Sequence, residues 1–116
     1  MDSSTVVEAT AVGVSGSDPA EEATALLAVA ADPVRWRLLT ALAEAAHCVC
    51  ELQPIGGVAP NLLSYHLRVL REAGLVSASR RGRWIDYALT GDALQRLHAA
   101  LPVARHAAST GPRGCG

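Results

Sequence analysis

The chain has 116 residues, half of them hydrophobic, which corresponds to a single domain with enough apolar residues for a core. The formal net charge is −1, but residues 1–32 carry six acidic and no basic side chains, whereas residues 59–87 carry five arginines against two acidic residues. Because nucleic-acid affinity follows the charge density of the contacting face, the near-neutral total does not exclude DNA binding. The sequence does argue against a secretory signal and a membrane span, since no charged start precedes an apolar run and no apolar stretch reaches about 20 residues. We therefore expect a cytoplasmic protein with no membrane partner.

The N-terminal part of the chain changes character near Asp18. Residues 1–18 are rich in Ser, Gly and Thr without helical periodicity, which predicts a disordered arm. From Ala20 to Ala31 the composition turns to Ala, Leu and Glu, with Asp18 as the N-cap and Pro19 at the first helical position. This predicted helix is apolar on much of its surface. We expect it to lie at a subunit interface, although packing on the chain's own core is an alternative.

The next segments predict a helix-turn-helix. Asp32-Pro33 begins a second helix that runs to about Ala46, and His47 to Gln53 is a short element stopped by Pro54 and the two glycines that follow. A longer helix then runs from Asn61 to Ala73, with Gly74 as its cap. Its core stripe is expected to be Leu63, Leu67 and Leu70, while the opposite face is polar and basic.

A hairpin and a last helix complete the predicted domain. Leu75–Arg80 and Trp84–Leu89 are strand-like and are joined at Gly82 by a turn flanked by arginines. Thr90-Gly91-Asp92 begins a final helix that Pro102 bends or ends, and residues 109–116 predict a flexible tail. The predicted fold is therefore mainly α with a two-stranded β-wing (α+β), a winged helix-turn-helix over residues 19–108.

The polar side chains of the longer helix and the hairpin arginines are the candidates for DNA contact. Helix residues at this position reach bases and phosphates in the major groove, and hairpin arginines suit phosphates or the minor groove. A solvated charged surface and a winged-helix module that binds protein are the alternatives. The candidates are Asn61, Ser64, Tyr65, Arg68 and Arg71 in the helix, and Arg80, Arg81 and Arg83 in the hairpin.

Two of the three cysteines, Cys48 and Cys50, precede the longer helix. Thiolates select thiophilic metals such as As(III), Sb(III), Cd(II) or Pb(II) over hard cations. Residues i and i+2 of an α-helix point about 200° apart, so one ion requires these cysteines to lie in an extended segment. We therefore expect ligand binding to hold the first turn of the short helix out of helical geometry and to unseat the longer helix. A buried structural pair and a reversible redox switch are the alternatives.

Four stretches of the sequence resemble the ArsR/SmtB family of metal-responsive winged-helix repressors. The resemblance implies a homodimer that binds double-stranded operator DNA and is released by a metal, here As(III) or Sb(III), with Cd(II) or Pb(II) as the alternative. The chain offers no Ser/His/Asp set, paired carboxylates or phosphate loop for an enzyme. The matching stretches are ADPVR with Leu38-Leu39, the CVCEL of residues 48–52, LSYHLRVLREAGLV of residues 63–76, and RRGRW of residues 80–84 with Tyr87 and Leu89.

The chain departs from the family pattern at two places. The third cysteine that often follows in the arsenite branch is Gln53 here. The last helix offers Asp92, His98 and His106, whose spacings differ from the family's zinc or nickel ligands. A third donor for arsenite is therefore expected from Cys115, in the same or the partner subunit, unless His47 or a small cellular thiol completes the site. An idle tail thiol is the alternative role for Cys115.

Overall fold

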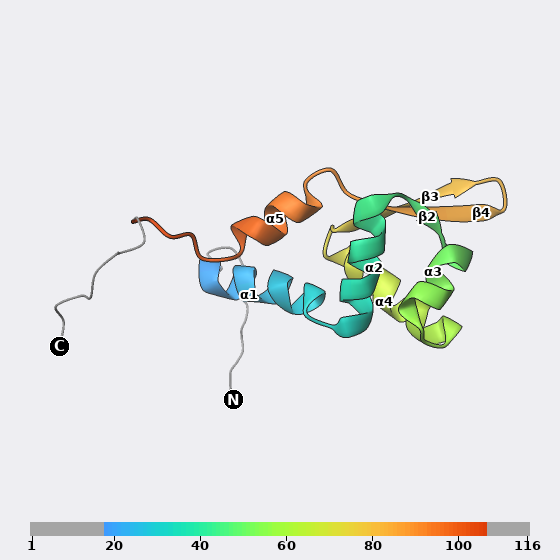
Figure 1. Ribbon diagram of the computed structural model, residues 1–116, viewed down its shortest axis with the longest axis horizontal. Helices are drawn as coiled ribbons and strands as arrows, with labels where there is room; N and C mark the ends of the chain where they lie inside the picture. The colour runs from blue at the N-terminus through green and yellow to red at the C-terminus, as the bar shows by residue number, and fades with distance from the viewer. Residues whose placement is uncertain (1–17, 107–116) are drawn as a thin grey trace, which may run out of the picture.

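The computed structural model describes residues 18–106, which form five helices and one three-stranded antiparallel sheet (Figure 1). The predicted arm, apart from Asp18, and the predicted tail lie outside the described residues. In chain order the elements are α1 (Pro19–Ala30), α2 (Pro33–Glu44), β2 (His47–Cys48), α3 (Val49–Gly56), α4 (Pro60–Glu72), β3 (Val76–Arg81), β4 (Trp84–Leu89) and α5 (Ala93–Ala99).

Aspartate-proline pairs begin the first two helices, as the sequence predicts. The Asp18 carboxylate accepts a hydrogen bond from the backbone N–H of Ala20 (3.1 Å). The Asp32 carboxylate accepts from Val34 (2.9 Å) and Arg35 (3.1 Å). These bonds satisfy N–H groups that have no partner within the first helical turn. Both helices therefore start where local chemistry requires.

Leucines from α2, α3 and α4 make most of the core. The stripe expected on α4 is confirmed, since Leu63, Leu67 and Leu70 are each 2% exposed or less. The other buried hydrophobic residues are Leu38, Leu39, Leu42, Leu52, Leu75, Val76, Tyr87 and Ala93. In contrast, α1 has no buried residue and only packs its partly exposed Leu26, Val29 and Ala30 against this core. Within one subunit, α1 therefore keeps apolar surface in contact with solvent.

The segment between α2 and α4 differs from the sequence prediction. The helix α3 continues through Pro54 and ends at Gly57, whose φ of 69° is left-handed. A proline removes one backbone hydrogen bond but does not prevent a short helix whose other bonds remain. The chain is extended at Ala45, and His47 and Cys48 pair with Tyr87 and Asp86 of β4. The sheet thus has three strands in the order β2-β4-β3: the predicted two-stranded hairpin of β3 and β4 is confirmed, and β2 is an additional strand that the sequence did not indicate.

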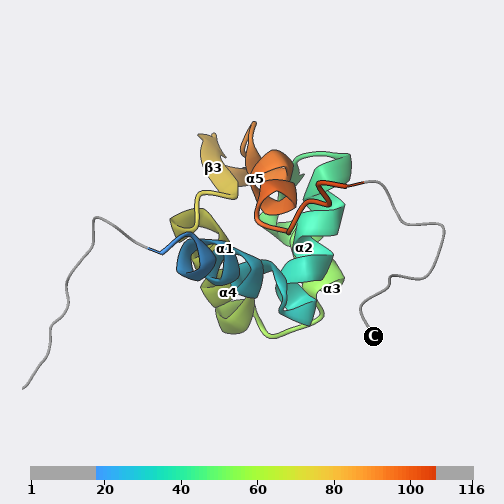
Figure 2. The same ribbon diagram turned by 90° about the vertical axis from the view of Figure 1, so that its left-hand side faces the viewer.

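The two ends of the molecule differ in structure. We call β3, β4 and the turn between them the wing; it projects at one end, and α1 and α5 lie at the other (Figures 1 and 2). Gly74, with φ 76°, turns the chain from α4 into β3. Among the described residues, no helix is long and apolar enough to cross a membrane.

Candidate nucleic-acid interface and thiol site

One face of α4 carries all five helical candidates for DNA contact. We call it the reading face; it consists of Asn61, Ser64, Tyr65, Arg68 and Arg71, all exposed. The buried leucine stripe occupies the opposite side of the helix. The Arg68 guanidinium lies 5.7 Å from the centre of the Tyr65 ring, a cation–π contact that orients both side chains. The geometry therefore presents polar, basic and aromatic groups together, and their contact with DNA stays a prediction.

His66 ties the reading helix to the start of α2. Its Nδ1 lies 2.9 Å from an Arg35 guanidinium nitrogen, and the Arg35 Nε donates to the Val29 carbonyl (2.6 Å). His66 is thus a partly buried, hydrogen-bonding residue. The Asp32 carboxylate lies 3.8 Å away. The pKa of that carboxyl is below its usual value, chiefly because the Arg35 backbone N–H donates to it.

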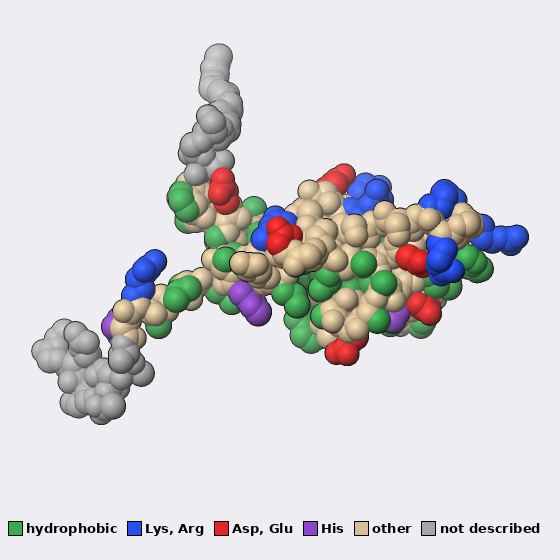
Figure 3. Space-filling view, turned by 90° about the horizontal axis from the view of Figure 1, so that it is seen from above, with side chains coloured by type: hydrophobic (Ala, Val, Ile, Leu, Met, Phe, Trp, Pro, Cys, Tyr) green, Lys and Arg blue, Asp and Glu red, His purple; other side chains and the backbone are tan. Residues whose placement is uncertain are grey.

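The three wing arginines are exposed but not equivalent. Arg side chains gather at the wing end of the molecule, with acidic groups beside them (Figure 3). Arg81 forms a two-point ion pair with Asp86, at 2.7 Å and 3.2 Å. Arg80 donates weakly to the Gly82 carbonyl (3.4 Å), and Arg83 has no hydrogen bond or ion pair within residues 18–106. Sequence reasoning missed the Asp86 partner, although a carboxylate on the facing strand was a usable signal.

Cys48 and Cys50, which we call the thiol pair, straddle the beginning of α3. Cys48 is the N-cap, with an extended backbone (φ −78°, ψ 163°), and Cys50 is the second helical residue. Their Cα atoms are 5.4 Å apart and the two sulfurs are joined as a disulfide. The expectation that a regular helix cannot hold both sulfurs on one ligand agrees with this geometry. Cys48 itself lies outside the helix in extended backbone, and α3 is regular from Val49 onward; whether ligand binding distorts the first turn stays a prediction.

Among residues 18–106, the surroundings of the thiol pair supply polar contacts. The Glu51 carboxylate accepts from the backbone N–H of Cys48 and contacts Nδ1 of His47, both at 3.1 Å. Within the described residues, no group of three or more His, Cys, Asp or Glu side chains is placed to hold a metal. The third donor predicted at Cys115 lies outside the described residues. Once the disulfide is reduced, the two thiolates, one exposed at Cys50 and one half-buried at Cys48, fit part of a thiophilic site.

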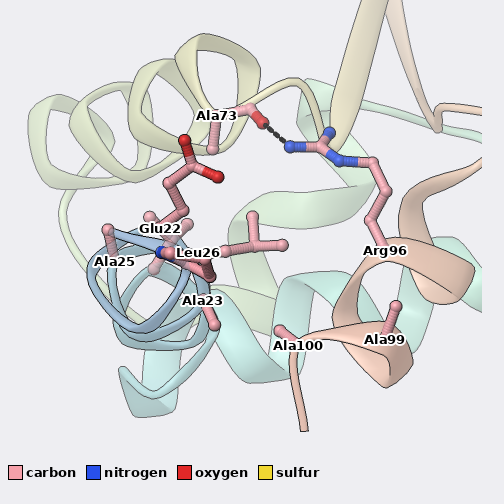
Figure 4. Close-up of a pocket in the computed structure, with 10 residues that line it drawn as sticks. Glu22, Ala23, Ala25, Leu26, Ala73, Arg96, Ala99 and Ala100 are labelled. Carbon is pink, nitrogen blue, oxygen red and sulfur yellow. Dashed lines mark hydrogen bonds between the residues drawn. The ribbon is translucent and has the colours of Figure 1, made fainter. Parts of the chain in front are cut away.

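An open cleft of about 650 Å³ lies between α1 and α5 (Figure 4). Its walls are mainly alanine with Leu26. The Arg96 guanidinium on α5 donates to the carbonyls of Ala73 and Gly74, both at 3.0 Å, and so closes the end of α4 (Figure 4). Sequence reasoning did not single out Arg96, since nothing local marks a contact between two helix ends.

Comparison with known proteins agrees with this geometry. Residues 32–78 match the model of a bacterial regulatory protein family, the arsR family. A transcriptional repressor described as an SmtB homolog from Synechocystis sp. is 36% identical over 81 residues, which cover 70% of this chain and 61% of that protein. This chain thus spans about three fifths of that curated relative.

Two solved structures extend the comparison to the fold. One, described as a possible transcriptional regulator for arsenical resistance, is 39% identical with a TM-score of 0.60, covering 64% of this chain and 77% of its own. The other is a homodimeric winged helix-turn-helix DNA-binding domain from Mycobacterium bovis, which is 26% identical with a TM-score of 0.59. The match covers 68% of this chain and 73% of that domain. These likenesses confirm the winged helix-turn-helix predicted from the sequence.

Proposed function

The chain belongs to the ArsR family of bacterial regulatory proteins, and we propose that it is a homodimeric repressor released from operator DNA when As(III) or Sb(III) binds its thiol pair. The family and the matched relatives regulate transcription and are not enzymes, in agreement with the sequence. One observation carries the proposal: the two sulfurs meet at the first residues of the helix-turn-helix, directly before the helix with the reading face.

DNA binding is assigned to the reading face and the wing. Helix α4 follows the short α3 after a tight turn, which is the arrangement in which the second helix enters the major groove. Asn61 and Arg68 present an amide and a guanidinium, the groups that read adenine and guanine edges, and Arg83 reaches outward to the phosphates. Phosphate contacts should supply most of the affinity and make it salt-dependent.

Ligand binding is assigned to Cys48 and Cys50. The pair offers two soft donors, and arsenite needs a third, which Cys115 of either subunit or a small cellular thiol would provide. A Cd(II) or Pb(II) ligand is the alternative within the same class. The relative described as a possible regulator for arsenical resistance supports the arsenic assignment.

The homodimer is assigned to the surfaces of α1 and α5. Helix α1 has no buried residue within one subunit, and the cleft it forms with α5 is lined mostly by small apolar side chains, together with the charged Glu22 and Arg96. Leu94, Leu101 and Val103 are also exposed, on α5 and in the segment that follows it. A second copy would cover these groups. The homodimeric M. bovis domain supports this assignment.

The test is a titration of the protein–operator complex with arsenite, Cd(II) and Zn(II), followed by fluorescence anisotropy. Arsenite should weaken binding by the wild type about tenfold or more, which is a typical coupling between two sites. Cys48→Ser and Cys50→Ser should abolish that loss while still binding the operator. Cys115→Ser also removes one thiol but leaves the pair intact. An unchanged arsenite response in this variant would mean that the tail does not provide the third donor. An operator complex that survives saturating arsenite would refute the arsenic assignment.

The disulfide favours one second function, a thiol-redox switch. In that case peroxide takes two electrons and two protons from the two thiols, forming the S–S bond and two waters. Peroxide would then release the operator in the wild type and in Cys115→Ser, whereas arsenite would leave the complex bound. The same anisotropy titration therefore separates the two functions.

A further inference from the structure

We propose that Asp86 couples the thiol pair to the wing, so that closing the pair holds Arg81 against the sheet and opening it releases Arg81. The inference deepens the proposed function and rests on it for the DNA-binding readout. It concerns a positioning residue, since Asp86 is proposed to act through the Arg81 guanidinium that it binds.

The first step of the coupling is backbone pairing. Cys48 lies directly opposite Asp86 in the β2–β4 ladder, and Ser79 of β3 lies opposite Asp86 on the other side. Directly opposite residues of an antiparallel pair point to the same face of a sheet, with Cβ atoms about 5 Å apart. Cys48 and Asp86 therefore share one face. Arg81, two residues after Ser79, lies on that face as well.

The second step is the ion pair. The Asp86 carboxylate binds the Arg81 guanidinium at two points, 2.7 Å and 3.2 Å, and so lays this arginine along the sheet instead of outward. The pKa of Asp86 is lowered by the Arg81 hydrogen bond and the pKa of Arg81 is raised by it. The negative charge of Glu51 adds to the rise for Arg81. Glu51 is also the residue that accepts from the Cys48 backbone.

The third step is the weak pairing of β2 with β4, which allows Cys48 to move. Strand β2 has only two residues, so few hydrogen bonds fix Cys48 to β4. Bridging the sulfurs fixes the Cys48 backbone at the point where the strand ends and α3 begins. On β4, the neighbouring Tyr87 is buried in the core, which confines any displacement to Asp86 and the residues toward the wing tip. Closing or opening the thiol pair should therefore shift the backbone at Asp86, the residue that binds Arg81.

The proposed direction of the change starts from the closed state, which is the one state that the structure contains. Here the thiol pair is closed by its disulfide and Arg81 is held by Asp86. When the pair is closed, the wing thus has one arginine fewer, Arg81, that can contact a DNA phosphate. Opening the pair returns that charge to the DNA-contacting surface. Bridging by arsenite would reproduce the closed state, which agrees with release of the operator.

Hydrogen exchange of the wing tests the coupling without DNA or metal. The full-length protein in a Cys115→Ser background is compared after reduction by dithiothreitol and after oxidation by diamide, so that only this pair can close. Peptides covering residues 79–86 should exchange more slowly in the oxidised protein, and Asp86→Asn should lose that difference. Cys48→Ser is the control that cannot close the pair. Equal exchange in both states of the parent protein, or an undiminished difference in Asp86→Asn, would overturn the inference whatever the protein binds.

Operator binding provides the second readout. Arsenite should weaken binding by Asp86→Asn less than about threefold, against about tenfold or more for the wild type. Asp86→Glu should restore most of the response, and Asp92→Asn, which removes a carboxylate outside the wing, should leave it intact. A wild type without arsenite response would refute the proposed function alone, since hydrogen exchange decides the coupling. A wild-type-like response in Asp86→Asn would refute the coupling alone.

Discussion

Replacement of Arg83 by Ala tests whether the wing contacts the DNA backbone. Arg83 is exposed in the turn of the wing and has no hydrogen bond or ion pair within the described residues, so its full charge is available to a phosphate. Each phosphate contact contributes about −0.9 to the slope of log affinity against log salt concentration. A homodimer carries two wings, so Arg83→Ala should make the slope shallower by about 1.8. Between about 50 and 200 mM salt, the variant should therefore lose about 12-fold less affinity than the wild type loses.

The assay is anisotropy of a labelled operator duplex over that range of salt. Arg105→Ala is the matched control, because it removes the same charge from the segment after α5, at the end opposite the wing (Figure 1). If Arg83→Ala gave the same slope as Arg105→Ala, the wing would not contact phosphate through this residue.

Two further predictions concern stability. Arg96→Ala should lower the free energy of unfolding by about 1–3 kcal/mol, because two carbonyls at the end of α4 lose a charged donor. Urea unfolding measures this loss, with His98→Ala, a change at an exposed residue of the same helix, as the control. Equal free energies of unfolding for the two variants would contradict the prediction. Asp32→Ala should cost about 1 kcal/mol at pH 7 through loss of the α2 cap. Because the folded-state pKa of Asp32 is lowered, that contribution is present above about pH 4 and disappears as the pH falls through the folded-state pKa. A difference between Asp32→Ala and wild type that stayed constant down to about pH 2 would refute it.

Features set by neighbouring residues were predictable from the sequence. Asp32-Pro33 starts a helix through its own carboxylate, and Gly74 ends one through its positive φ. The leucine stripe of α4 follows from spacing alone. These rules place the reading face correctly because each operates within a few residues of the chain.

Contacts between distant segments escaped prediction. The strand β2 exists only because β4 offers it an edge, and two residues carry too little pattern to indicate a strand. The Arg81–Asp86 and Arg96–Gly74 contacts depend on the register of the hairpin and on how α5 returns to α4. The need for non-helical backbone at the thiol pair was predictable from helix geometry, but the exact start of α3 at Val49, which leaves Cys48 extended, was not.

The proline inside α3 also bears on the affinity of the site. Pro54 has no N–H, so it cannot donate to the carbonyl of Cys50 four residues earlier. The turn that carries Cys50 is thus held by one backbone hydrogen bond fewer, worth about 0.5–1.5 kcal/mol. If Cys50 binds an ion, this missing bond lowers the free-energy cost of moving the Cys50 backbone to fit ions of different radius. A single proline would then trade selectivity among thiophilic ions for breadth of response.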